Sequence, residues 1–139
     1  MRQKKNNFLG MGFDRLADAE LDIMRVLWNA GEPLKVSEIV GKLSATRSWK
    51  TQTAHVLLKR LEEGGFVSAD KSGYSFLYSP VIDERTYIEA ESRALASRTG
   101  GSLRMMIASL IDSDTLTSED IDELDQLIER KRSELKGGN

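Results

Sequence analysis

The sequence contains no cysteine and a single histidine, His55. Without cysteine the chain forms no disulfide, holds no metal through thiolates and has no cysteine nucleophile. With one histidine, a Ser-His-Asp triad or a multi-histidine metal site would have to be built around that residue alone. The composition therefore argues against an enzyme, and we expect no cofactor and no metal.

Long hydrophobic runs are also missing. No stretch of about 18 apolar residues is present to cross a membrane. The N-terminal "MRQKKNNFLGMGFD" has basic residues but lacks the apolar segment of a secretory signal. Hydrophobic residues make up 40% of the 139 residues and charged residues 30%, which is typical of a soluble globular protein. We therefore expect a cytoplasmic protein without a membrane partner.

The charge is nearly balanced over the whole chain but unevenly distributed along it. The formal net charge is -2, yet residues 1–80 hold 12 Lys and Arg against 9 Asp and Glu, a net charge of +3. Residues 81–139 hold 8 against 13, a net charge of -5. Phosphate attracts the first part and repels the second, so the asymmetry predicts which half would face a nucleic acid.

Helical periodicity and turn signals alternate through the first 80 residues. A helix is predicted in "ADAELDIMRVLWNAG", capped by Asp18 and ended by Gly31, and a short helix in "EPLKVSEIVGKLS". A third helix has Ser48 as its expected N-cap and ends at "EEGG". The runs "FVSAD" and "YSFLYSP" flank "KSG" and predict a β-hairpin that Pro80 ends. This order is typical of a winged helix-turn-helix.

Beyond Pro80 the strand signals vanish and the pattern is helical throughout. We therefore predict a flexible N-terminal tail over residues 1–14, a winged-helix DNA-binding domain over residues 15–81 and a helical domain over residues 82–136. The predicted fold class is mostly α, with a small β-hairpin as the wing and three helices in the second domain.

The three predicted C-terminal helices are amphipathic, with Asp83 and Thr117 as caps of the first and third. About 55 residues in three such helices cannot close a good core alone, so a second copy is the economical way to bury their apolar stripes. The pattern therefore predicts a homodimer. The candidate dimerisation residues are Tyr87, Ile88, Leu103, Met106, Ile107, Leu110, Ile121, Leu124, Leu127 and Ile128.

The stretch "SWKTQTAHVLLKRLEEGGFV" has two different faces at 100° per residue. One face is an apolar stripe made of Ala54, Leu57, Leu58 and Leu61. Gln52, Val56 and Lys59 lie opposite it, where an ordinary solvated face is the simplest interpretation. Gln pairs with adenine, however, Lys reaches guanine or phosphate, and Val contacts the thymine methyl group. With a short helix before it, this face favours contact with DNA bases.

Residues around the same helix complete the predicted DNA surface. Threonines near the helix N-terminus suit phosphate, as do the cations before it. Trp49 either packs on the domain or lies against the sugar-phosphate backbone, and Lys71 is either a solvated turn residue or a phosphate contact of the wing. The predicted DNA-binding residues are Arg47, Trp49, Lys50, Thr51, Gln52, Thr53, His55, Val56, Lys59 and Lys71.

Four motifs together resemble the BlaI/MecI-type penicillinase-repressor family: "LADAELDIMRVLW", "SWKTQTAHVLLKRLEEGGFV", "YSFLYSPVIDERTYIEAES" and "LTSEDIDELDQLIE". The resemblance implies a winged-helix repressor that binds palindromic DNA operators as a homodimer in an antibiotic-resistance response to β-lactams. It also implies release by a regulatory protease, with cleavage near Gly101, Ser102 and Leu103; an ordinary helix cap and turn is the alternative for these residues. The family's Trp-x-x-x-Thr element corresponds to Trp49 and Thr53.

These observations predict a DNA-binding transcriptional repressor without catalytic residues. The alternative is a winged-helix protein-interaction module that does not bind DNA and uses its C-terminal helices to hold a partner. Steeply salt-dependent DNA binding would favour the repressor, because neutralised phosphates release counterions.

Overall fold

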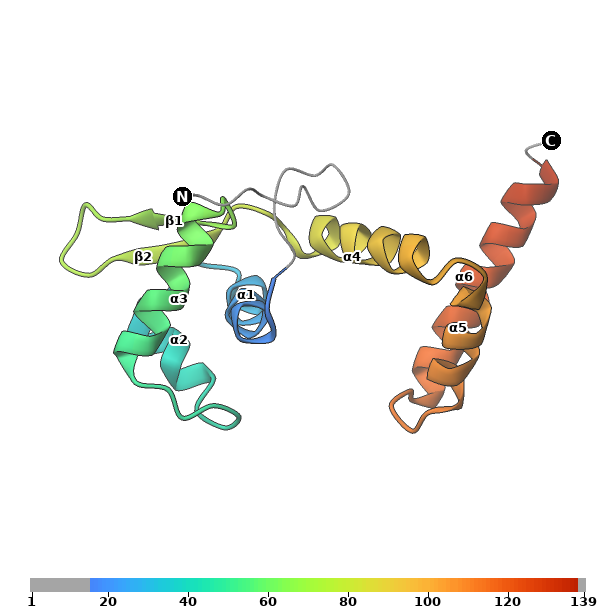
Figure 1. Ribbon diagram of the computed structural model, residues 1–139, viewed down its shortest axis with the longest axis horizontal. Helices are drawn as coiled ribbons and strands as arrows, with labels where there is room; N and C mark the ends of the chain where they lie inside the picture. The colour runs from blue at the N-terminus through green and yellow to red at the C-terminus, as the bar shows by residue number, and fades with distance from the viewer. Residues whose placement is uncertain (1–15, 138–139) are drawn as a thin grey trace. The chain divides into compact units, whose positions relative to one another are not determined.

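The computed structural model describes residues 16–137 and divides into two compact units, one that ends at Ala94 and one that begins at Leu95. The predicted tail, residues 1–14, lies outside the described residues. The elements, in chain order, are α1 (Asp18–Ala30), α2 (Val36–Lys42), α3 (Thr51–Glu63), β1 (Val67–Asp70), β2 (Leu77–Pro80), α4 (Glu84–Thr99), α5 (Leu103–Asp112) and α6 (Ser118–Gly137) (Figure 1). The predicted mostly helical fold with a winged helix-turn-helix in its first half is confirmed.

The core of the first unit collects apolar side chains from every one of its elements. Its largest fully buried side chains are Ile23, Met24, Leu27, Ile39, Leu58, Leu61 and Tyr87. Burying one such side chain stabilises the fold by roughly 1.5–3 kcal/mol relative to leaving it in water. Because α3 contributes two of them, one side of that helix is committed to the interior and the other side is left for solvent.

Helix α1 begins and ends through local backbone chemistry. Its N-cap is Ala17 and not the predicted Asp18, which is the first helical residue. The Glu20 side chain reaches back and accepts a hydrogen bond from the Ala17 N–H at 3.0 Å, so one unpaired N–H at the helix start is satisfied without a capping side chain. Gly31 ends the helix at φ 69°, a left-handed conformation that glycine adopts without steric cost.

Helix α3 begins at Thr51, with Lys50 as its N-cap in an extended conformation, so the prediction of Ser48 as the cap was wrong. Trp49 packs against the edge of the core just before the helix. At the other end the N–H of Phe66 donates to the Leu61 carbonyl, and the N–H of Gly65 donates to the carbonyl of Glu62. With Gly65 at φ 85°, this is the Schellman arrangement, and it turns the chain into β1.

The wing is an antiparallel pair in which Val67 lies opposite Pro80 and Asp70 opposite Leu77. An isolated bridge adds Leu34 beside Tyr78, with hydrogen bonds of 2.8 and 3.0 Å between their backbones. The second strand starts at Leu77, later than the predicted start at residue 74. The Asp70 side chain accepts hydrogen bonds from the N–H and hydroxyl of Ser72, a local turn that ends the ladder early.

The start of α4 belongs to the first unit, and Tyr87 is the reason. Its side chain is fully buried, its hydroxyl accepts a hydrogen bond from the Leu16 N–H at 3.0 Å, and its ring lies 6.1 Å from that of Trp28. The Trp28 indole N–H in turn donates to the carbonyl of Ile82. These contacts extend the first unit to Ala94, beyond the boundary after residue 81 that the loss of strand signals suggested.

The second unit contains the end of α4, a short 3₁₀ turn, α5 and α6. The predicted capping box of α6 is confirmed, because Thr117 and Asp120 exchange hydrogen bonds of 3.0 Å between side chain and backbone. The predicted cap of α4 is confirmed too, since Asp83 accepts from the Thr86 N–H at 2.9 Å. No residue of α5 or α6 is buried.

Candidate DNA-binding surface

The outward face of α3 carries the predicted base-contacting residues. Ala54, Leu58 and Leu61 are buried on the opposite side, so this helix cannot rotate to hide the polar face. Val56 is 53% exposed although it is apolar, which leaves its methyl groups available to a partner. One shallow, open concavity on this face is lined by Thr51, Gln52, His55, Val56 and Lys59.

A second groove adjoins this face. It has a volume of about 400 Å³ and lies between the start of α2, α3 and the hairpin; its lining residues are Lys35, Val36, Ser37, His55, Tyr74, Ser75, Phe76 and Tyr78. His55 lines both hollows, so the outward face of α3 continues without a break to the wing. Tyr74 is fully exposed and Phe76 is 42% exposed. Helix and wing therefore share one continuous surface.

The predicted wing cation, Lys71, has partners within its own unit. Its ammonium lies 3.2 Å from the Glu62 carboxylate and 5.5 Å from the centre of the Phe76 ring. Half of the Lys71 side chain is exposed, so the pair is a surface ion pair of little strength. A phosphate can compete with Glu62 for this cation.

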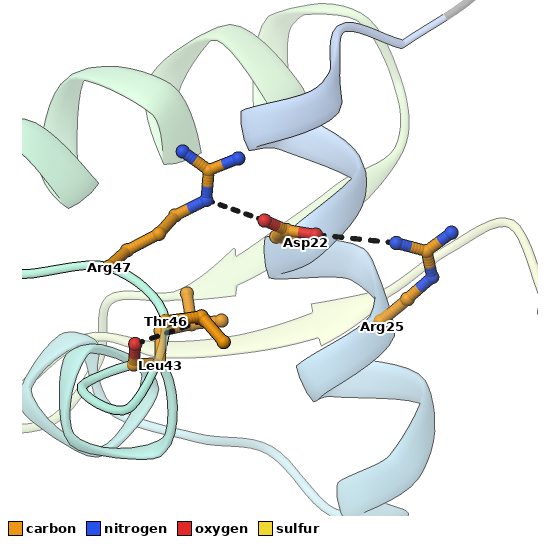
Figure 2. A network of polar contacts seen from close by, with 5 residues as sticks. All are labelled: Asp22, Arg25, Leu43, Thr46 and Arg47. Carbon is orange, nitrogen blue, oxygen red and sulfur yellow. Dashed lines mark hydrogen bonds and ion pairs between the residues drawn. The ribbon is translucent and has the colours of Figure 1, made fainter.

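The segment before α3 is held by a network that spacing along the sequence did not indicate. Asp22 of α1 lies between Arg25 and Arg47, as Figure 2 shows. The Arg47 guanidinium also lies 5.1 Å from the centre of the Trp49 ring. Asp22 was missed because its partner is 25 residues away, and no periodic pattern links two such positions.

The structure brings most of the predicted DNA-binding residues onto one side of the first unit. Thr51, Gln52, Thr53, His55, Val56 and Lys59 are exposed on α3, and Lys50 is exposed at its N-cap. Trp49 is half-buried against the core, in agreement with the packing alternative for this residue. Arg47 is half-buried as well, and only part of its side chain faces outward.

The predicted dimerisation residues fall into three groups. Tyr87 was wrongly included, because it is fully buried in the first unit and cannot contact a second copy. Leu103, Met106 and Leu124 are half-buried. The exposed members are Ile88, Ile107, Leu110, Ile121, Leu127 and Ile128. Met105, Ile111 and Leu135 are exposed as well.

The predicted cleavage region lies in the connection between α4 and α5. Gly100–Ser102 is a single 3₁₀ turn, with Gly100 at φ 54°, and all three residues are exposed. Leu103 is the first residue of α5. Within residues 16–137 no cluster of three or more metal-ligating side chains exists, and no helix is long and apolar enough to span a bilayer.

The fold is a winged helix-turn-helix, and its third helix presents amide, ammonium and methyl groups outward. These features place the protein in the class of winged-helix DNA-binding proteins. The penicillinase repressor family profile matches residues 16–130. A penicillinase repressor of Bacillus licheniformis is 34% identical over 123 residues, which are 88% of this chain and 95% of that protein. The chain belongs to the penicillinase repressor family.

Further similar proteins are known. An uncharacterised 16.5 kDa protein of Latilactobacillus sakei is 29% identical over 119 residues, 85% of this chain and 81% of that one. The solution structure of the DNA-binding domain of the repressor BlaI has 36% identity and a TM-score of 0.46, covering 52% of this chain and 88% of that chain. Monomeric Bacillus licheniformis BlaI in complex with the blaP half-operator has 35% identity and the same TM-score, with coverage of 54% and 90%. Family membership makes the protein a DNA-binding transcriptional repressor and not an enzyme.

Proposed function

We propose that the protein represses transcription by binding an inverted-repeat operator as a homodimer, with α3 of each copy in the major groove. The observation that carries this proposal is the outward face of α3, where Gln52, Val56 and Lys59 are exposed while the opposite side is locked into the core. An α-helix fits the major groove, where each base pair presents a distinct pattern of donors, acceptors and methyl groups.

Each residue on this face has a defined role in the proposal. The Gln52 amide makes a paired hydrogen bond to adenine, the Lys59 ammonium reaches guanine, and the Val56 methyl groups pack on a thymine methyl. Thr51 lies at the first turn of α3, where its hydroxyl and the free backbone N–H groups suit a phosphate. Lys71 on the wing gives up its ion pair with Glu62 and contacts a neighbouring DNA phosphate instead.

Dimerisation through the second unit is proposed from the apolar side chains of α5 and α6 that have no cover within one chain. Leu110 is 60% exposed, Ile128 50% and Ile107 49%. Exposed apolar patches of this kind mark interaction sites, and most soluble oligomers are assemblies of identical copies, which supports a second copy as the cover. A two-fold dimer places its two recognition helices about one turn of DNA apart, which requires an inverted repeat.

Release by a regulatory protease is also part of the proposal. The exposed turn Gly100–Ser102 offers a substrate segment between α4 and α5. A cut there would separate the DNA-binding unit from the proposed dimer contacts without touching its core. Linking two heads raises avidity by about 10² to 10⁴, so separating them would empty the operator at the same protein concentration. Action on chromosomal operators would place the protein in the cytoplasm.

The decisive experiment starts from genomic DNA that the purified chain retains. Sequencing that DNA identifies a candidate operator, and fluorescence anisotropy then compares it with a scrambled duplex. Gln52→Ala and Lys59→Ala are each expected to weaken operator binding by about 1–3 kcal/mol and to change scrambled-duplex binding much less. Arg85→Ala, which removes one exposed cation from α4, is the matched control and should leave the ratio between the two duplexes unchanged.

Lys71→Ala tests the wing separately. A phosphate contact carries no sequence information, so this variant should weaken binding to both duplexes and reduce the salt slope by about 1. Salt-insensitive or absent DNA binding by the wild-type chain would overturn the proposal and favour the protein-interaction module.

A further inference from the structure

Asp22 joins α1 to the segment that leads into α3. Its Oδ2 atom accepts a hydrogen bond from Arg47 Nε at 2.5 Å, and its Oδ1 atom accepts one from Arg25 Nη1 at 3.3 Å. The Asp22 side chain is 25% exposed, so the pair with Arg47 is partly shielded from solvent. A hydrogen bond between two charged groups, as here, is shorter and stronger than one between neutral groups.

Arg47 is fixed at three places. Its backbone N–H donates to the Leu43 carbonyl at 2.7 Å, its Nε donates to Asp22, and its guanidinium carbon lies 5.1 Å from the centre of the Trp49 ring. The neighbouring Thr46 hydroxyl also donates to the Leu43 carbonyl at 3.3 Å, which closes the turn after α2. The Asp22 hydrogen bond and the Trp49 ring therefore restrain the side chain before any DNA arrives.

One edge of the Arg47 guanidinium remains for a ligand. Asp22 occupies the Nε edge, and the two terminal nitrogens point away from Asp22 (Figure 2). The side chain is 32% exposed. It belongs to the segment that enters α3, three residues before Lys50, which is the N-cap of the helix. Two parallel N–H donors from a fixed guanidinium match the oxygens of one phosphate.

We propose that Asp22 is a positioning residue for DNA binding: it holds Arg47 so that the terminal nitrogens meet a backbone phosphate beside α3. The inference rests on the proposed function of this surface. Ordering a long side chain on binding costs affinity, and a side chain ordered in the free protein avoids that cost. Asp22 also carries a negative charge, which by itself repels DNA. Replacing Asp22 by a neutral residue should therefore weaken DNA binding if positioning dominates, and strengthen it if charge repulsion dominates.

The test measures anisotropy of the full chain on a mixed-sequence duplex of about 30 base pairs, long enough for two half-sites, over a range of salt. Asp22→Ala is expected to weaken binding about 2- to 10-fold although it removes a negative charge. Arg47→Ala should weaken binding and reduce the salt slope by about 1. In the Arg47→Ala background, Asp22→Ala should cause no further weakening, because its effect passes through Arg47.

Arg47→Lys is the second variant, since it leaves α1 untouched and keeps the positive charge. Lys has no Nε donor for Asp22 and no fork for the phosphate, so binding should weaken about 2- to 10-fold with the salt slope retained. Arg25→Ala removes the other partner of Asp22 and serves as the control; it should change binding less than Asp22→Ala does. Thermal melts of each variant report whether the fold is intact.

Two results would overturn the positioning role. One is wild-type or tighter binding by Asp22→Ala or by Arg47→Lys. The other is an equal loss from Asp22→Ala with and without Arg47, which would mean that the aspartate acts through the fold alone. Both are distinct from failure of the proposed function, in which the wild-type chain itself shows no salt-dependent binding to the duplex.

Discussion

The two units of this protein contain the same kind of amphipathic helix but differ in how far its apolar stripe is buried within one chain. In the unit that ends at Ala94, the apolar stripes of α1, α2 and α3 meet around a shared core, and every residue from 16 to 137 that is buried lies between Leu16 and Ala90. In the unit that begins at Leu95, the apolar stripes of α5 and α6 stay uncovered, with Leu135 at 70% and Leu110 at 60% exposure.

Helical periodicity therefore predicts that one face of a helix will be buried, but it does not identify the element or the second chain that buries it. The apolar stripe of α3 packs against α1, α2 and the hairpin of the same chain. The apolar stripes of α5 and α6 are not fully covered by other elements of the same chain. The first unit should therefore hold its structure alone, whereas the second should depend on a second copy. The following predictions test that difference.

The largest expected effect comes from placing a charge on the uncovered face. Leu110→Asp should convert the proposed dimer to a monomer, because a carboxylate cannot be buried there without a partner. Operator binding should fall by about 10² to 10⁴ through lost avidity. Sedimentation velocity and anisotropy measure the two effects. Ser109→Asp adds the same charge at an exposed polar position of α5 and is the control; a dimer that survives Leu110→Asp would refute the assigned face.

The next effect concerns the covered face. Leu58→Ala should destabilise the first unit by about 2–5 kcal/mol, because it opens a cavity at a fully buried position. Leu110→Ala removes the same atoms from an exposed position and should change the unfolding of that unit far less. Urea unfolding followed by tryptophan fluorescence reports on this unit, since Trp28 and Trp49 both pack on its core. Equal effects of the two substitutions would contradict the contrast.

A smaller effect tests where the first unit ends. Tyr87→Phe keeps the buried ring but leaves the Leu16 N–H without its hydroxyl partner, which should cost about 1–3 kcal/mol. The loss should occur in the unfolding of the first unit, and dimerisation should be unchanged. Ile88→Ala, one residue later and 48% exposed, should have the smaller effect on that unfolding. The opposite ranking would assign the start of α4 to the second unit.

The smallest effect is a pH dependence at the start of α4. Hydrogen bonds from the side chain and backbone of Thr86 hold the pKa of Asp83 below its ordinary value of about 3.9. A carboxyl group whose folded pKa is depressed stabilises the fold fully above its unfolded pKa and loses that contribution as the pH falls through the folded pKa. Asp83→Asn should therefore reduce stability above about pH 4 and make the remaining stability less sensitive to acid. Urea unfolding between pH 7 and pH 3 measures it, and parallel acid curves for both proteins would contradict it.

Local signals in the sequence predicted much of the fold. The glycine end of α1, the Asp83 cap of α4 and the capping box of Thr117 and Asp120 were all found from residues a few positions apart. Two caps were wrong, at Asp18 and Ser48. The structure has Glu20 reaching back to Ala17 at the start of α1, and Trp49 packed against the core just before α3.

The candidate site was predictable to the same extent. The outward face of α3 followed from its periodicity, because residues on one helix keep their angular order whatever surrounds them. The network of Asp22, Arg47 and Trp49 was not found, and neither was the pair of Glu62 with Lys71. The base and phosphate contacts assigned to α3 and the wing remain predictions for the binding experiments.

The amino-acid sequence by itself determined which segments form helices and turns, which face of each helix is apolar, and which half of the chain is basic. These properties depend on residues within about one or two helical turns, and short-range sterics and hydrogen bonding decide them. Only the tertiary structure decided that Tyr87 closes the first core and that Asp22 holds Arg47. Such contacts join residues distant along the chain, and they exist only once packing has brought their elements together.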